Sequence, residues 1–465
     1  MAKGKNIEKL QITGISADGK SVGRKEGLVV FVRGGAPGDV VDVRITGKRK
    51  KFLEGVVVKM HQSSPDRVKP FCEHFGVCGG CKWQHINYDA QLRYKQNHVA
   101  ENLKKLTDVP MPEVIPILGT EPTTYYRNKL EFTFSNRRWL TKEEIDSEEE
   151  FSRNALGFHI PKMFDKVLNI DHCHLQATPS NAIRLQLKAF AEREELPFYD
   201  LKSHQGFLRN LIIRTTSTGE VMVIVQFAED DKKRILRTLT FLDDEFPEIT
   251  SLNYVVNTKL NDTFYDLPVI NYTGRTYIQE QMGNLTFRIG PKSFYQTNSK
   301  QAHELYNLAL EFAGLQGDEV VYDLYTGTGT IANFVAADAK KVVGIESVPE
   351  AVEDAKINSS INQIDNTDFY AGDMKDLLTS DFIESNGSPD VVITDPPRAG
   401  MHKNVIKVLN ELKAPKIVYV SCNPATQARD IQDLSVNYEV TKIQPVDMFP
   451  HTHHVECVVL LELSK

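Results

Sequence analysis

The most reactive side chain of this sequence is a cysteine at the end of an apolar run. Cys422 stands in the polar, turn-forming segment 421–424 (SCNP), directly after residues 416–420 (KIVYV). A turn at a strand end favours an accessible thiol, whereas an unreactive cysteine is most often a small buried hydrophobe. Because a thiolate is a strong nucleophile, we expect Cys422 to be a catalytic nucleophile. Cys457 lies in the mostly apolar run 455–461 and is expected to be a core residue.

Two motifs upstream describe a cofactor pocket. Residues 323–330 (DLYTGTGT) form a glycine-rich turn after an apolar run, and Glu346 ends the next run, where a carboxylate can bond ribose hydroxyls. Alone, this pattern fits a nicotinamide dinucleotide as well as S-adenosylmethionine. The segment 395–400 (DPPRAG) favours S-adenosylmethionine, because two consecutive prolines stiffen the chain and hold the Asp395 carboxylate toward the pocket without competing strand pairing.

These motifs fall at the ends of predicted strands of one sheet. Apolar runs alternate with helical segments through the last third of the chain, which predicts a doubly wound parallel sheet. The predicted strands are 319–323, 341–345, 368–371, 391–394 and 417–421. Ligands of such sheets bind beyond the carboxyl ends of the strands, so Glu346, Asp395 and Cys422 should converge on one pocket.

Four other cysteines have the spacing of a metal site. Cys72, Cys78 and Cys81 lie within ten positions, among glycines that let the backbone wrap, and Cys173 is a distant fourth thiol. Four thiols suit a tetrahedral sulfur site. Zinc commonly takes short gaps on both sides, so the asymmetric spacing with one remote ligand favours an iron–sulfur cluster and leaves zinc as the alternative.

The chain is long enough for two or three domains. Short apolar runs separated by Gly and Pro over residues 1–62 predict a small antiparallel β-barrel. Residues 63–290 are expected to form an α+β domain that carries the cysteine site, although its helix 87–107 could pack on the last domain. Residues 291–465 complete a multidomain α/β protein with a C-terminal Rossmann-like domain.

Charge is unevenly distributed along the chain. The net charge is −7, but residues 1–70 hold 15 Lys plus Arg against 7 Asp plus Glu, which leaves a balance of −15 for the remainder. A basic segment attached to an acidic body indicates a polyanionic partner. The chain has no apolar stretch long enough to span a membrane, and residues 1–5 lack the apolar core of a leader, so we expect a cytoplasmic protein without a membrane anchor.

In the order of its motifs, the sequence resembles the S-adenosylmethionine-dependent RNA (uracil-5-)-methyltransferases, specifically the 23S ribosomal RNA branch with an N-terminal TRAM barrel and a [4Fe-4S] cluster. The resemblance covers nearly the whole chain. It rests on the barrel, the four cysteines and the segments 126–129 (YRNK), 294–298 (FYQTN), 323–329, 395–400, 421–424 and 451–456 (HTHHVE). The ordered set is more specific than any single motif.

The resemblance implies a role for each residue of the set. Cys422 would be the nucleophile and Glu456 the general base. The residues that would line the cofactor and base pocket are Gln296, Tyr325, Glu346 and Asp395. The residues that would hold the cluster are Cys72, Cys78, Cys81 and Cys173. The implied substrate is a specific uridine of 23S rRNA.

The expected chemistry explains why a thiol is needed. Carbon 5 of uracil is a weak nucleophile, but addition of Cys422 to carbon 6 gives an enolate whose carbon 5 can accept a methyl group. Glu456 would then remove the proton from carbon 5 so that the thiol can leave. The alternatives are a tRNA uracil-5-methyltransferase, a cytosine-5-methyltransferase, which usually has its cysteine after the fourth strand, and a non-catalytic RNA-binding or assembly factor.

Overall fold

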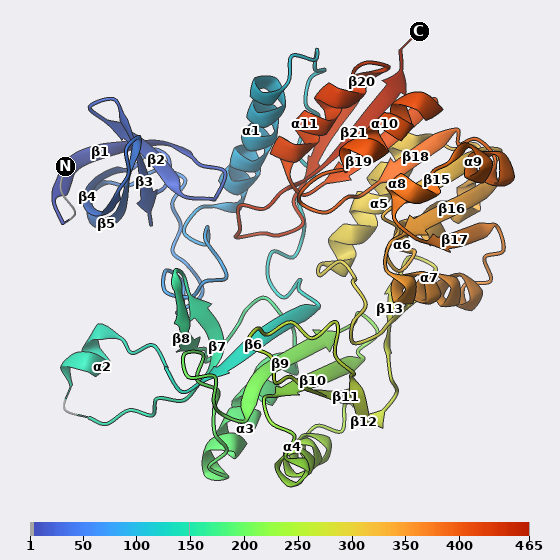
Figure 1. Cartoon of the computed structure of the whole chain (residues 1–465). Coiled ribbons are helices and arrows are strands. Elements are labelled where there is room, and N and C mark those ends of the chain that lie inside the picture. Colours follow the sequence, from blue (N-terminus) through green and yellow to red (C-terminus); the bar gives the residue numbers. More distant parts are fainter. Residues whose placement is uncertain (1–3, 148, 465) are drawn as a thin grey trace.

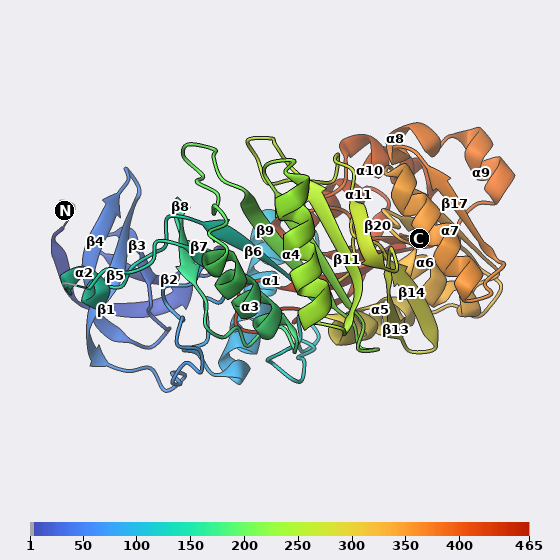
Figure 2. The same cartoon turned by 90° about the horizontal axis from the view of Figure 1, so that it is seen from below.

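The computed structural model describes residues 4–147 and 149–464 (Figure 1). Figures 1 and 2 show a barrel, a central sheet and a C-terminal sheet as separate bodies, with helix α1 (Tyr88–Leu106) between the barrel and the C-terminal sheet. The expectation that the chain has no leader was based on residues 1–5. Of these, residues 1–3 lie outside the described part of the chain. No helix of the described residues is both long and apolar enough to cross a lipid bilayer.

The N-terminal strands close into a barrel in the order β1-β2-β3-β5-β4, which confirms the predicted barrel. The expected antiparallel pairing is wrong at one place, because β3 and β5 are parallel. The strands are β1 (Asn6–Ile15), β2 (Ser21–Lys25), β3 (Leu28–Arg33), β4 (Val40–Lys48) and β5 (Phe52–Gln62). Alternate residues such as Val41, Val43 and Ile45 point into the barrel and are fully buried. The interior is so tight that a side chain at Gly55 would begin 2.3 Å from Cγ1 of Val43. The barrel is therefore a packed core and not a ligand cavity.

The central domain is built on a seven-stranded sheet in the order β12-β11-β10-β9-β6-β7-β8. Its strands are β6 (Lys129–Ser135), β7 (Ala155–Ile160), β8 (Met163–Asn169), β9 (Leu208–Thr215), β10 (Val221–Phe227), β11 (Ile249–Val256) and β12 (Ile270–Gly274). Helices α3 (Ser180–Arg193) and α4 (Lys232–Glu245) cover one face (Figure 2).

The opposite face of the central sheet joins the hydrophobic core of the C-terminal domain. On β10, Val223 and Val225 pack with the core under α3 and α4, whereas Met222 and Ile224 belong to the other core. This alternation is the period of a strand that is buried on both faces. The central and C-terminal domains therefore share a continuous apolar contact.

The acidic segment 142–150 begins with the short helix α2 (Lys142–Asp146). Thr141 and Glu144 form a capping box at the start of this helix. Residue 148 of the segment lies outside the described residues.

The C-terminal domain is a seven-stranded, doubly wound sheet in the order β17-β16-β15-β18-β19-β21-β20, as predicted. Its strands are β15 (Val320–Leu324), β16 (Lys341–Glu346), β17 (Thr367–Ala371), β18 (Val391–Thr394), β19 (Lys416–Ser421), β20 (Tyr438–Val446) and β21 (Glu456–Leu463). The first five in chain order are parallel, and β21 enters antiparallel between β19 and β20.

Helices cover both faces of this sheet. One face packs against α5 (Ser299–Ala313), α6 (Thr330–Val335) with the 3₁₀ turn η1 (Ala336–Asp338), and α7 (Pro349–Ile361). The other face packs against α8 (Met374–Leu377), α9 (Ser380–Asn386), α10 (Lys403–Leu412) and α11 (Pro424–Leu434). Helix α1 joins this second layer, because Val99 and Leu103 are buried in the same core and α1 lies along α11.

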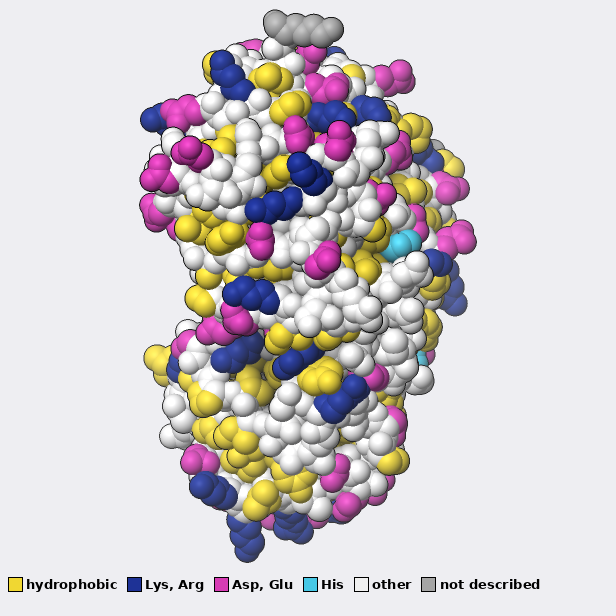
Figure 3. All heavy atoms as spheres, turned by 90° about the vertical axis from the view of Figure 1, so that its right-hand side faces the viewer, with side chains coloured by type: hydrophobic (Ala, Val, Ile, Leu, Met, Phe, Trp, Pro, Cys, Tyr) yellow, Lys and Arg dark blue, Asp and Glu magenta, His cyan; other side chains and the backbone are white. Residues whose placement is uncertain are grey.

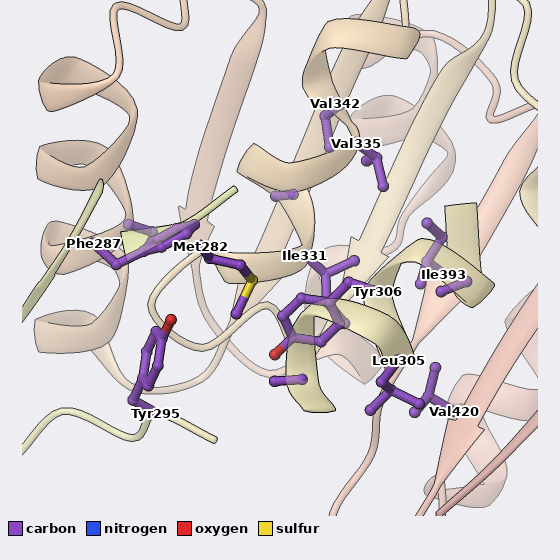
Figure 4. Packing of buried hydrophobic residues seen from close by; sticks show 14 of the residues in the cluster. Met282, Phe287, Tyr295, Leu305, Tyr306, Ile331, Val335, Val342, Ile393 and Val420 are labelled. Carbon is purple, nitrogen blue, oxygen red and sulfur yellow. The ribbon is translucent and has the colours of Figure 1, made fainter. Parts of the chain in front are cut away.

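A hairpin that precedes residue 291 also packs with the C-terminal domain. Strands β13 (Ile278–Met282) and β14 (Leu285–Ile289) pair with each other and lie against α5 and α7. Figure 4 shows Met282 of this hairpin between Phe287, also of the hairpin, and Tyr306 of α5, and all three belong to the same core. Because these side chains are almost fully buried, the hairpin completes the apolar core on that face of the sheet.

Candidate active site

The strand ends of the C-terminal sheet bring five candidate side chains to one edge. Asp323 lies near the end of β15, Glu346 ends β16, Asp395 follows β18 and Cys422 follows β19. Ser421 pairs with Cys457 in the antiparallel ladder of β19 and β21, so the next step of this ladder places Cys422 beside Glu456. The sheet topology thus places a thiol and a carboxyl group together although they are far apart in sequence.

The glycine turn after β15 is held in a fixed shape. Tyr325 has a φ of 65°, a left-handed conformation that residues other than glycine adopt mainly where the surroundings impose it. The backbone N–H of Gly327 donates to Oε2 of Glu346 at 3.2 Å, and the hydroxyl of Thr326 donates to Oδ2 of Asp323 at 2.5 Å. These bonds fix the turn against β15 and β16 before any ligand binds.

Asp323 is a candidate cofactor residue to which the sequence analysis gave no role. It is fully buried, and its Oδ2 also accepts a hydrogen bond from the backbone N–H of Ala332 at 3.0 Å. Its Oδ1 has no hydrogen-bond partner among the described residues. A buried acceptor without a partner is costly, so this oxygen is available to a donor or cation on a ligand. The feature of the sequence that could have identified Asp323 as a cofactor residue is its position directly before the glycines of the turn.

Burial makes three carboxyl groups of this edge weak acids. It raises the pKa of Asp395 to about 7, and it raises the pKa of Asp323 to about 7 with a contribution from the nearby Asp395. Burial, followed by Asp395, also raises the pKa of Glu456 to about 8. Several acidic groups in a water-poor pocket favour a positively charged ligand, because a cation would stabilise their ionised forms.

The groups around Cys422 shift the pKa of its thiol in opposite directions. Burial, and then the acidic groups of Glu456 and Asp395, raise the pKa of the thiol to about 11. Arg398 acts in the opposite direction through its charge and a hydrogen bond to the thiol. The backbone oxygen of Arg398 also accepts hydrogen bonds from Asn423 at 3.0 Å and from Thr426 at 3.3 Å. These contacts make Arg398 a second candidate site residue, after Asp323, that has no role in the predictions from sequence.

The segment that carries Gln296 is fastened to the central domain. Asn128 donates from Nδ2 to the backbone oxygen of Gln296 at 2.8 Å, and its own N–H donates to the oxygen of Thr297 at 2.8 Å. Thr328 of the glycine turn lies 3.4 Å from the backbone oxygen of Phe294. Gln296 is thereby held in a segment that touches the cofactor turn.

The four predicted metal ligands line one cavity of 200 Å³ in the central domain. Cys72, Cys78, Cys81 and Cys173 are all free thiols, and their cavity also contacts Arg127. Burial raises the pKa of Cys78 to about 12 and that of Cys81 to about 11. Within the described residues, no three His, Cys, Asp or Glu side chains converge closely enough to hold a single metal ion.

Two arginines of the central domain, Arg127 and Arg209, have different surroundings. Arg209 is buried and donates to the backbone oxygens of Asn257, Lys259 and Asn261 at 2.6 to 2.8 Å, so it supports a turn. Arg127 lies over the ring of Phe449 at 5.1 Å, at the wall of the cysteine cavity.

Comparison with known proteins defines the class to which this fold and site belong. Residues 272–464 match the family model of tRNA (Uracil-5-)-methyltransferase, and residues 7–58 match the TRAM domain. A protein of Bacteroides thetaiotaomicron described as an uncharacterized RNA methyltransferase is 56% identical over 97% of this chain and 100% of its own length. A protein of Porphyromonas gingivalis with the same description is 57% identical over 97% of this chain and 99% of its own length.

A solved structure extends this similarity to three dimensions. The Pyrococcus abyssi tRNA (uracil-54, C5)-methyltransferase in complex with S-adenosyl-L-homocysteine is 30% identical, with a TM-score of 0.74 over 97% of this chain and 100% of its own. The fold and site therefore define an S-adenosylmethionine-dependent RNA methyltransferase. The chain belongs to the RNA (uracil-5-)-methyltransferase family, which confirms the predicted enzyme class, its cofactor S-adenosylmethionine and its RNA partner.

The raised carboxyl pKa values predict that S-adenosylmethionine binding depends on pH. The sulfonium cation favours ionised Asp323, Asp395 and Glu456, whose pKa values are about 7, 7 and 8 in the free protein. Affinity should therefore increase as the pH rises through this range, by up to about tenfold per pH unit for each proton released. Calorimetry in two buffers of different ionisation enthalpy measures the released protons. S-adenosylhomocysteine, which lacks the sulfonium charge, is the matched control, and equal pH dependence of both ligands would contradict this expectation.

The contact between Arg398 and the thiol predicts a change in the reactivity of Cys422. Replacement Arg398→Met removes the cation that opposes the raised pKa, so alkylation of Cys422 should require a higher pH and slow by about tenfold near neutral pH. Mass spectrometry of the peptide containing Cys422 after timed alkylation measures this rate. Arg193→Met is the control, because that side chain is 64% exposed on α3. An unchanged rate profile in Arg398→Met would show that the arginine does not act on the thiol.

Proposed function

We propose that this enzyme methylates carbon 5 of a specific uridine in 23S ribosomal RNA. The observation that carries the proposal is the pairing of a thiol with a carboxyl group, Cys422 and Glu456, where β19 and β21 leave their ladder. Methyl transfer to an oxygen or nitrogen needs no covalent help from the enzyme. Transfer to carbon 5 of uracil does need it, because that carbon is nucleophilic only after a group has added to carbon 6.

Cys422 is the nucleophile of the proposed reaction. Its sulfur bonds to carbon 6 of the uracil, and the electron pair of the ring double bond makes carbon 5 the attacking atom. Arg398, at the thiol, stabilises the anionic sulfur against the effect of burial. Gln296, Tyr325, Glu346 and Asp395 line the pocket for cofactor and base. S-adenosylmethionine, when bound, supplies the electrophilic methyl group.

Glu456 is the general base that completes the reaction. Its carboxylate takes the proton from carbon 5, the double bond between carbons 5 and 6 re-forms, and the Cys422 sulfur leaves. The pKa of about 8 lies close to physiological pH, where a carboxyl group can both accept and release a proton. General-base assistance of this kind typically accelerates a step by about 10² to 10⁴.

The choice of 23S rRNA rests on the resemblance to the branch that combines a TRAM barrel with four cysteines. The barrel presents Lys48, Arg49, Lys50 and Lys51, all exposed, at the turn between β4 and β5. Figure 3 shows further Lys and Arg side chains near the narrowing between the C-terminal and central domains. Such cations can contact the phosphates of an RNA from which the target base is swung out.

A second candidate substrate is transfer RNA. It is favoured by the similarity to the Pyrococcus abyssi enzyme, which is named for uridine 54 of tRNA. The chemistry at Cys422 and Glu456 would be the same, so the two candidates differ only in the RNA that reaches the pocket.

Mapping of 5-methyluridine in a deletion strain tests the proposal. We expect one or more 5-methyluridines to disappear from 23S rRNA, to return with the wild-type gene and to remain absent with Cys422→Ser. The measurement is mass spectrometry of RNase fragments from separated 23S rRNA and tRNA. Loss from tRNA alone supports the second candidate. Unchanged 5-methyluridine in both RNAs, or full restoration by Cys422→Ser, would overturn the proposed reaction.

We also propose that Cys72, Cys78, Cys81 and Cys173 hold a [4Fe-4S] cluster with a structural role. The support is that the four thiols line one cavity whose walls are mostly apolar. A cluster of several iron and sulfide atoms fits thiols spread around a cavity. Cluster binding would displace the thiol protons of its ligands. Without a cluster, Cys78 and Cys81 retain these protons at neutral pH because their pKa values are raised.

Metal analysis of protein purified without oxygen tests the cluster. We expect about four iron and four sulfide per chain, falling in Cys173→Ser because one ligand is lost. Cys457→Ser is the matched control, since Cys457 is buried in β21 and away from the cavity. Stoichiometric zinc without iron would instead assign the site to a zinc ion.

A further inference from the structure

The carboxyl group of Glu456 is positioned by a hairpin loop. Strands β20 and β21 are joined by residues 447–455, and the last pair before this loop is Val446 with Glu456. A displacement at the start of the loop would therefore move the strand end that carries the carboxyl group. Partners from outside the hairpin hold its first five residues.

One of these partners is a buried lysine of helix α1. Lys95 donates from Nζ to Oδ1 of Asp447 at 2.5 Å and to the backbone oxygen of Phe449 at 3.0 Å. Tyr88, on the same face of α1, donates to Oδ2 of Asp447 at 2.9 Å. The side chains of Lys95 and Asp447 are completely buried. Desolvation makes such a pair a weak source of stability, so a role in fixing geometry explains it better.

A second partner, Gln91, lies one turn earlier on α1. Its Oε1 accepts a hydrogen bond from the backbone N–H of His451 at 2.8 Å, and its Nε2 donates to the oxygens of Ile86 at 2.8 Å and Trp83 at 3.2 Å. Gln91 is fully buried. This amide therefore joins the loop of the catalytic hairpin to the segment that follows the cysteines.

The backbone of His451 shows that the loop is held under constraint. Its φ is 64°, in the left-handed region, where residues other than glycine persist only if their surroundings over-determine them. The N–H groups of Lys82 and Trp83 both donate to the oxygen of His451, at 2.9 and 3.0 Å. The residues between Asp447 and His451 are held as well, because Asn298 donates to the oxygen of Met448 and Tyr126 to that of Pro450, both at 3.0 Å.

We propose that Gln91 and Lys95 are positioning residues for the general base. The inference rests on the proposed function of Glu456 and adds that helix α1, which comes from a distant part of the sequence, determines where its carboxyl group lies. Because Lys82 directly follows Cys81, the same contacts connect the wall of the cysteine cavity to the catalytic hairpin.

A misplaced base has a specific chemical consequence. Addition of Cys422 and methyl transfer precede the step that uses Glu456, so both still occur. The product of these steps keeps its carbon–sulfur bond until the proton on carbon 5 is removed. Methylated RNA should therefore stay covalently attached to the enzyme. A merely structural role of Gln91 or Lys95 would lower the amount of folded enzyme without producing this adduct.

The experiment compares Gln91→Met and Lys95→Met with the wild type on unsubstituted substrate RNA and S-adenosylmethionine. We expect a denaturing gel to show a stable RNA–protein adduct in both variants. Turnover should fall by about 10², and the KM for RNA should fall with it, because an adduct that accumulates makes its own breakdown the slow step. Glu456→Gln is the reference that marks complete loss of the base. Lys105→Met is the control, since Lys105 is 68% exposed near the end of α1. Thermal unfolding of each variant identifies those that are folded.

The outcomes distinguish the positioning role of Gln91 and Lys95 from the function proposed for Glu456. A folded Gln91→Met enzyme with wild-type turnover, or with low turnover and no adduct, overturns the positioning role. If Lys95→Met does not fold, Gln91→Met alone decides. Absence of an adduct in Glu456→Gln would instead contradict the function proposed for Glu456. Adduct formation in Lys105→Met would show that any change on α1 has this effect, and it would also overturn the inference.

Discussion

Three carboxyl groups lie close together at one water-poor edge of the C-terminal sheet, and the properties of the site follow from their proximity. Burial holds the pKa values of Asp323, Asp395 and Glu456 between about 7 and 8, far above those of exposed acids. The charged forms are costly until a positive ligand arrives. A sulfonium cofactor meets that condition. Its charge also favours the ionised form of Glu456, so cofactor binding and the protonation state of this carboxyl group are linked.

The architecture makes the active site a product of the whole chain. Strand β21 enters antiparallel beside β19, which is why a residue near the C-terminus faces Cys422. Helix α1 packs with the second helical layer of the same sheet although it precedes the central domain in sequence. The central sheet buries its other face against the C-terminal core. This shared apolar core joins the central domain directly to the domain that carries the candidate site.

Much of this organisation could be predicted from the sequence. The closed barrel and the doubly wound sheet are confirmed, because they follow from local patterns such as strand alternation. The enzyme class and its cofactor, which the resemblance of the ordered motifs to a known family implied, are confirmed as well. The roles of Cys422 and Glu456 and the cluster at the four cysteines remain proposals that the arrangement supports. Asp323 and Arg398 were part of quoted motifs but received no role. Their importance depends on an unpartnered oxygen and on a contact with a thiol, which only coordinates reveal.

Residue types and local periodicity are enough to show which side chains can do chemistry and that they stand at strand ends. The surroundings of these side chains depend on how distant segments pack. The pKa of Glu456 follows from burial among other acids, and the place of its strand end follows from Gln91 and Lys95, whose partners lie more than 350 residues away. Interactions across such separations leave no local pattern in a single sequence, since they arise only when distant segments pack together.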